Sequence, residues 1–161
     1  MTEAASTPGP RWLRLSSVLS LLAFSLVVGV ITFWPGPPDP DGQLALRAFL
    51  DQAHRTGLPL WITFGKIEFG ANIVMFVPIG FFGALALPRW RWLVVPAAVL
   101  GSGCIEVMQA ARLPDRFGTA RDVVANGLGA LVGYLLAAAL LSVLLRRDRR
   151  RAVAEPAMGQ A

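Results

Sequence analysis

Residues 71–80 read ANIVMFVPIG, and this stretch decides the fold. The run that contains it, 69–87, is close to the length of about 20 apolar residues that a helix needs to cross a bilayer. Within the run lie an amide, Asn72, and two residues that disfavour helices, Pro78 and Gly80. Proline removes one backbone hydrogen bond and tends to kink a helix, and neighbouring helices can satisfy the freed carbonyl. The stretch therefore predicts a membrane helix that bends near Pro78 and admits a close neighbour at Gly80.

Three further apolar runs, 15–34, 92–111 and 123–145, have a similar length. The chain is 55% hydrophobic and 16% charged, against about 45–50% and about 25% in soluble domains. The first run is longer than the apolar part of a secretory signal, about 7–15 residues, and it ends without a convincing cleavage site. These features predict an all-α fold, a polytopic bundle of four transmembrane helices in the lipid bilayer.

Basic residues predict the orientation of the bundle. The formal net charge is +5, but the arginines flank the apolar runs, so we interpret them as a topology signal and expect no nucleic acid partner. The densest clusters, PRWR at 88–91 and RRDRRR at 146–151, fall on the same side of a bundle with four spans. Cytoplasmic loops carry an excess of Lys and Arg. We therefore expect a multi-pass protein of the plasma membrane with both termini in the cytoplasm.

This topology divides the chain into five parts. They are a cytoplasmic segment 1–14, a first transmembrane helix 15–34, an extracytoplasmic loop 35–68, a core of three transmembrane helices 69–145 and a basic cytoplasmic tail 146–161. In the loop, apolar residues recur at helical spacing around 43–54, which predicts a short amphipathic helix on the membrane surface. The sole histidine, His54, belongs to no motif, and we expect it to be solvated in this loop.

Polar residues of the last three spans gather at the outward end. Ionisable residues in a membrane span are rare and costly, so each one is a candidate for function. They recur at intervals of three and four residues, which places them on one helical face. We expect them to converge on one shallow polar site: Glu68, Asn72, Glu106, Gln109, Arg116, Arg121, Asp122 and Asn126. In the alternative interpretation they only hold the helices together, because buried polar contacts stabilise membrane bundles.

Small residues predict where helices approach one another. Gly129 and Gly133 form a small-xxx-small pair on the last span, and we assign the same role to Gly101 and Gly103 on the third. Such residues let helix backbones come close together in a membrane. We interpret them, with Pro78 and Gly80, as structural residues of the bundle.

The core carries three motifs in a fixed order. They read Asn72-x3-Phe76-x-Pro78-x-Gly80, Glu106-x2-Gln109 and Arg116-x5-Asp122-x3-Asn126-x2-Gly129-x3-Gly133. In this order and spacing, over roughly residues 69–145, the chain resembles the VanZ-like family. The resemblance implies a small polytopic membrane protein of bacteria, and the founding member of the family is associated with reduced susceptibility to teicoplanin. The family has no settled reaction, so the resemblance carries over only a set of motif positions: Asn72, Pro78, Gly80, Glu106, Gln109, Arg116, Asp122 and Asn126.

Three kinds of function fit these residues. A non-enzymatic envelope protein would bind a lipidated or lipid-linked ligand, such as a lipoglycopeptide or a lipid-linked wall precursor. Arg116 and Arg121 suit its phosphate or carboxylate groups, since guanidinium groups make bidentate contacts. An intramembrane enzyme acting on a lipid-linked precursor would use Glu106 and Asp122 as acid and base. A structural partner in a membrane complex would need the cluster only for packing.

The sequence lacks the motifs of metal-dependent, phosphate-binding and nucleophilic enzymes. It has no paired cysteines or histidines at metal-ligand spacing and no Gly-rich phosphate loop before a helix. It also shows no nucleophile with a base beside it. We therefore favour binding over catalysis, with no cofactor and no metal. The sequence does not identify the ligand, the oligomeric state or any role in glycopeptide resistance.

Overall fold

The computed structural model describes residues 11–33, 40–112 and 120–154, and these residues form helices and turns but no strands. The helices are α1 (Arg11–Phe33), α2 (Pro40–Arg55), α3 (Phe64–Ala86), α4 (Val94–Arg112) and α5 (Ala120–Ala154), with a short 3₁₀ turn (Arg91–Leu93) before α4. Four segments are long and apolar enough to cross a membrane: α1, α3, Arg91–Ala111 and Ala120–Arg147. The predicted all-α class, with four apolar spans and an extra helix in the loop, is confirmed.

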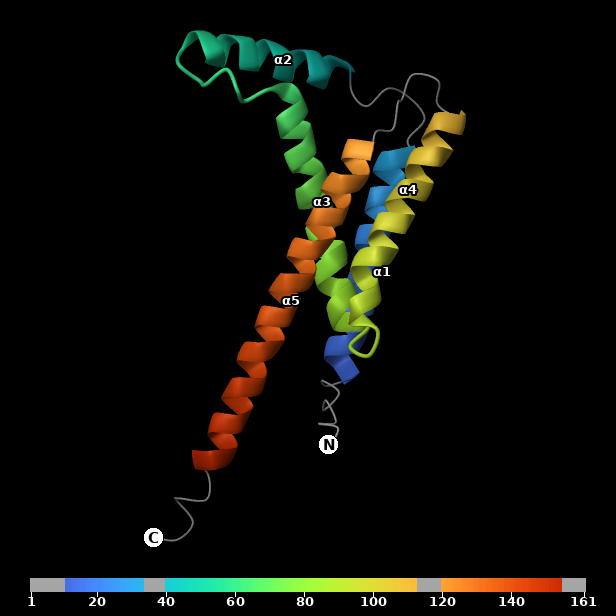
Figure 1. Ribbon diagram of the computed structural model, residues 1–161, viewed down its shortest axis with the longest axis vertical. Coiled ribbons are helices and arrows are strands. Elements are labelled where there is room, and N and C mark those ends of the chain that lie inside the picture. Colours follow the sequence, from blue (N-terminus) through green and yellow to red (C-terminus); the bar gives the residue numbers. More distant parts are fainter. Residues whose placement is uncertain (1–10, 34–39, 113–119, 155–161) are drawn as a thin grey trace.

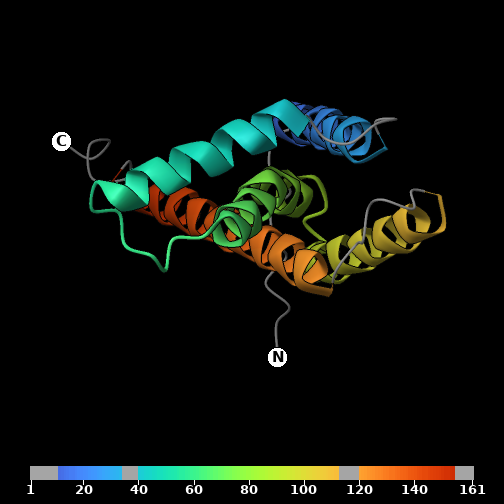
Figure 2. The ribbon, with the colours of Figure 1, turned by 90° about the horizontal axis from the view of Figure 1, so that it is seen from above.

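Helix α3 occupies the middle of the bundle. It packs most extensively on α5 and next on α1, while α4 packs on α5. The order across the bundle is therefore α1, α3, α5 and α4, as Figure 2 shows from above. α3 and α5 run in the same direction, because α4, which follows α3 in the chain, leads back to the end of the bundle at which α3 began (Figure 1). The central pair of helices is thus parallel, although each is antiparallel to its other neighbour.

Helix α2 lies across the end of the bundle at which α3 and α5 begin (Figure 1). α1 begins and α5 finishes at the opposite end. An even number of spans produces this arrangement, because each span reverses the side on which the chain lies. The cytoplasmic location of both termini stays a prediction.

Large apolar side chains cover the outside of the bundle. Leu26 on α1 is 68% exposed, Leu100 on α4 is 70% exposed and Leu135 on α5 is 55% exposed. Soluble monomers rarely expose apolar patches of this extent to water. Lipid tails are as apolar as leucine, so such side chains are accommodated where they face a bilayer.

Glycines allow α3 and α5 to touch along their backbones. A Cβ added at Gly80 would overlap the carbonyl of Ala130, and one at Gly129 or Gly133 would overlap the carbonyl of Ile73 or Val77. No larger residue fits at these three positions unless the helices separate. The expectation for α4 was wrong, since a Cβ at Gly101 or Gly103 would meet nothing within 4 Å. α4 instead approaches α5 at Gly127, where an added Cβ would lie 2.9 Å from Val99 Cγ2.

The helices extend beyond the predicted spans. α3 begins at Phe64, inside the predicted loop, and runs without a break through Pro78 to Ala86. The bend expected at Pro78 stays a prediction. α5 has 35 residues and includes the basic segment as far as Ala154. At about 1.5 Å per residue it is far longer than the hydrocarbon core of about 30 Å, so its basic end is a helical extension of the last span.

Candidate functional site

Five polar residues from three helices form a group near the α2 end of the bundle, which we call the polar cluster: Asn72, Ser102, Glu106, Asp122 and Asn126. Its first link joins the parallel helices. Asn72 Nδ2 donates a hydrogen bond to Asp122 Oδ1 at 2.9 Å, across 50 positions of sequence. Both side chains are half-buried. The contact of Gly129 with the Ile73 carbonyl brings the two backbones together and so places these side chains within reach.

The second link joins the antiparallel helices α4 and α5. Asn126 Nδ2 donates to Ser102 Oγ at 2.8 Å. Asn126 is 7% exposed and Ser102 is 1% exposed, so this contact is among the most buried polar contacts of the described residues. The sequence did not identify Ser102, although it precedes Glu106 by one helical turn and shares its face. Asn126 was expected to face Asn72 and Glu106. Its side-chain amide instead donates its hydrogen bond to Ser102.

Glu106 lies level with Asp122. In an antiparallel pair that places Ser102 opposite Asn126, one turn forward on α4 corresponds to one turn back on α5. This register brings Glu106 opposite Asp122, and the two carboxyl groups interact electrostatically. Among the described residues, Glu106 Oε2 and Asn126 Oδ1 are buried without a hydrogen-bond partner. Both atoms accept hydrogen bonds, so the cluster offers buried acceptors to a donor.

Arg121 contacts the first turns of α3. Its Nη2 donates to the carbonyl of Gly65 at 2.8 Å, and its guanidinium carbon lies 5.2 Å from the centre of the Phe69 ring. The side chain therefore lies along the first turns of α3, and it is exposed. A guanidinium has five N–H donors, and this contact uses only part of them.

The other predicted site residues are dispersed. Gln109 Nε2 donates to the carbonyl of Thr32 at 3.1 Å and so joins α4 to the last turn of α1. Glu68 is exposed on α3, and no contact between described residues joins it to the polar cluster. Arg116 lies outside the described residues. The structure thus brings together four of the predicted residues, adds Ser102, and places Gln109, Arg121 and Glu68 apart from them.

An apolar crevice runs beside the polar cluster. Its volume is about 300 Å³, and its walls come from α1, α3 and α4, with Leu21, Val28, Phe76, Ala98 and Ile105 among them. Ser102 also lines it, so the crevice reaches the buried hydrogen bond of the cluster. The Gln109 contact bridges α1 and α4 near its α2 end. The crevice therefore meets the polar cluster at Ser102, while Glu106 and Asn126 do not line it.

The described residues hold no group of three or more His, Cys, Asp or Glu that could bind a metal ion. In a comparison with protein families, the model of the VanZ/LLP1 family matches residues 21–144. Searches of curated proteins and of solved structures returned no match. The family match extends the similarity from the core into the first span and the loop, and it covers most of the chain.

Proposed function

The chain belongs to the VanZ/LLP1 family of membrane proteins, and on this premise we propose that it binds a lipidated or lipid-linked ligand of the bacterial envelope at the polar cluster. The observation that carries the proposal is the pair of buried acceptors, Glu106 Oε2 and Asn126 Oδ1, beside an apolar crevice. A ligand with a polar head and a hydrocarbon chain matches both parts. A lipoglycopeptide such as teicoplanin and a lipid-linked wall precursor each have this composition.

Energetics favour a ligand over packing alone. An unsatisfied buried acceptor costs about 1–3 kcal/mol, and more when it is charged. A bundle that needed only packing would place apolar or fully paired residues there, because interhelical hydrogen bonds contribute only about 0.6 kcal/mol on average. A donor from the ligand would offset the cost. Arg121 would add positive charge for a phosphate or carboxylate at the same end, and Arg116, five residues earlier in the sequence, is a second candidate.

Substitution of the cluster tests this proposal. Glu106→Gln and Asp122→Asn keep similar volumes, and Asn126→Ala removes the amide group. Glu68→Gln is a matched control at the same end of α3 without contact to the cluster. We expect the three cluster variants to reach wild-type abundance in the membrane. The purified variants should no longer retain teicoplanin. Any change in teicoplanin susceptibility that the wild-type protein causes should be absent from cells that produce the variants. The control should behave as wild type.

The opposite pattern would support a packing role. If every cluster variant lost abundance in the membrane, the residues would act as interhelical contacts and the binding proposal would fail. Arg116→Ala extends the same test to a residue outside the described ranges.

A second candidate, an intramembrane enzyme, rests on the level placement of Glu106 and Asp122 across α4 and α5. Two carboxyl groups in different surroundings can act as acid and base. Purified protein would be incubated with a lipid-linked wall precursor, and the lipids analysed by mass spectrometry. A changed product that disappears in Glu106→Gln would establish catalysis, and an unchanged precursor that stays bound would support binding.

A further inference from the structure

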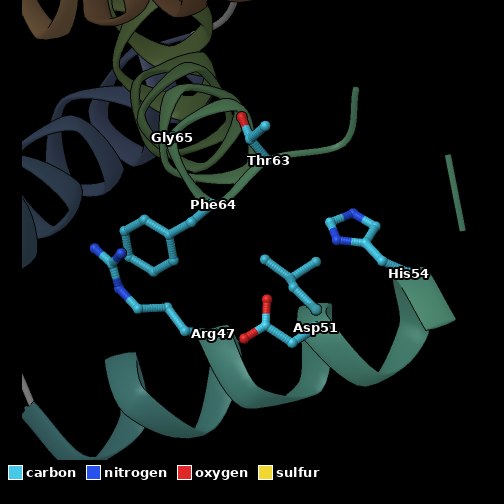
Figure 3. A pocket seen from close by; sticks show the side chains of 7 residues that line it. Arg47, Asp51, His54, Thr63, Phe64 and Gly65 are labelled. Carbon is cyan, nitrogen blue, oxygen red and sulfur yellow. The ribbon is translucent and has the colours of Figure 1, made fainter. Parts of the chain in front are cut away.

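A second cavity lies away from the polar cluster, between α2 and the start of α3. Its volume is about 590 Å³ (Figure 3). We call it the α2–α3 cavity. Residues of the last turns of α2 form one wall, and Thr63, Phe64 and Gly65 form the other. It is therefore at the end of the bundle where the amphipathic helix crosses the membrane spans, and the polar cluster contributes no residue to it.

Arg47 brings a positive charge into this cavity. Its guanidinium carbon lies 4.3 Å from the centre of the Phe64 ring, and Figure 3 shows the side chain reaching from α2 toward that ring. Stacking on an aromatic face holds the planar group and leaves its N–H edges available to acceptors. Within the described part of the chain, no carboxylate forms an ion pair with Arg47. Asp51, one turn further along α2, lies on the cavity wall as the opposing charge.

His54 shapes the other end of the cavity. Its Nε2 lies 3.0 Å from the carbonyl oxygen of Ile62. A carbonyl only accepts, so Nε2 donates, and the bond ties the segment that enters α3 back onto α2. The expectation that His54 is a solvated loop residue was wrong. It is half-buried at the end of a helix and fixes the distance between the two walls.

Further cations and an aromatic ring lie around the start of α3, next to the residues of one cavity wall. Arg121 donates to the carbonyl of Gly65, which lines the cavity. Lys66 Nζ lies 5.0 Å from the centre of the Trp61 ring, and Trp61 is 65% exposed. Tryptophan favours the interface between membrane and water. The lining of the cavity holds one arginine and one aspartate, so Arg47 is its source of positive charge, and exposed Trp61 indicates the depth at which lipid headgroups lie.

We propose that the α2–α3 cavity binds the phosphate of a membrane phospholipid, with Arg47 as its main contact. A guanidinium matches phosphate through two parallel hydrogen bonds. Leu50 and Phe64 line the same cavity and suit the apolar part of a lipid near its headgroup, which a free phosphate ion lacks. This site is separate from the ligand of the polar cluster and goes beyond the proposed function.

The test uses the full-length protein purified in detergent. Phosphatidylglycerol, diacylglycerol and inorganic phosphate are added separately, and binding is followed by native mass spectrometry and by the shift of the thermal midpoint. We expect phosphatidylglycerol to bind and raise the midpoint. Diacylglycerol lacks the phosphate and inorganic phosphate lacks the chains, so both should bind far more weakly. Equal binding of either one would overturn the proposal.

Variants of α2 identify the contact. Arg47→Ala should weaken phosphatidylglycerol binding by about ten- to a hundredfold, as loss of a charge-assisted hydrogen-bond pair predicts. Arg55→Ala removes an equal charge from the same helix outside the cavity and should leave the affinity unchanged. Asp51→Asn removes the opposing charge and should strengthen binding, which keeps the proposal testable if Arg47→Ala folds poorly. Equal losses in Arg47→Ala and Arg55→Ala would show general surface attraction and contradict the site. Glu106→Gln should retain phospholipid binding, so the two proposals can fail separately.

Discussion

Replacing Gly129 by alanine tests the contact on which the bundle is built. The added methyl group would overlap the carbonyl of Ile73 and would lie 2.9 Å from Cβ of Phe76, inside ordinary van der Waals contact. The nearest obstacle is backbone, which cannot rotate away as a side chain can. α3 and α5 must therefore separate, and this movement also disturbs the bond between Asn72 and Asp122.

The expected cost follows from two opposing effects. Overpacking a close contact costs about 1–3 kcal/mol, and the rigid obstacle places Gly129→Ala at the upper end. Alanine also favours a helix over glycine by about 1 kcal/mol, which offsets part of the loss. We expect a net destabilisation of about 2 kcal/mol. Gly70→Ala is the matched control on α3, because a Cβ there meets nothing within 4 Å, and it should stabilise the protein by up to about 1 kcal/mol.

The assay is reversible unfolding of the purified protein in mixed micelles with a rising fraction of dodecyl sulfate, followed by circular dichroism. The two variants should differ by about 3 kcal/mol, roughly a hundredfold in the unfolding equilibrium. If Gly129→Ala unfolded at the same dodecyl sulfate fraction as Gly70→Ala, the backbone contact between α3 and α5 would be absent, and the register of the polar cluster would need another explanation.

Three further predictions follow from other contacts. Asn72→Ala leaves the half-buried Asp122 carboxylate without its amide donor and should lower the free energy of unfolding by about 1–3 kcal/mol in the same micelle assay. Ala98→Trp should fill the apolar crevice and abolish retention of a lipidated ligand at normal abundance, whereas Leu100→Trp, on the exposed face of α4 outside the crevice, should not. In a Cys104→Ser background, Arg55→Cys should react with a membrane-impermeant maleimide added to intact cells. If the cysteine at position 55 did not react, the orientation in the membrane would be the reverse of the predicted one.

The sequence predicted the number and type of the helices because these depend on local properties. The length of an apolar run and the thickness of a bilayer determine a span, whatever its neighbours are. The same reasoning placed Asn72 and Asp122 at one end of the bundle, since helical periodicity and alternating direction determine the depth of each residue. Their depth was predictable, and their hydrogen bond is consistent with it.

The partners of the polar residues were not predictable in the same way. They depend on how each helix is rotated about its axis, and this rotation follows from contacts such as Gly80 with Ala130. Serine is frequent in membrane helices, so the position of Ser102 one turn before Glu106 does not by itself identify it as the partner of Asn126. Arg121 lies in the first turn of α5, where a long side chain can reach either side, and it reaches Gly65.

The parallel pair at the centre also orders the electric field of the bundle. α3 and α5 present their N-terminal ends on the α2 side, and α1 and α4, which the bond of Gln109 to Thr32 joins, present their C-terminal ends there (Figure 1). A helix carries about half a positive charge at its N-terminus and half a negative charge at its C-terminus. The field on this side is thus positive over α3 and α5 and negative over α1 and α4. Asp122 lies in the first turn of α5, the position at which the dipole of α5 favours a negative charge.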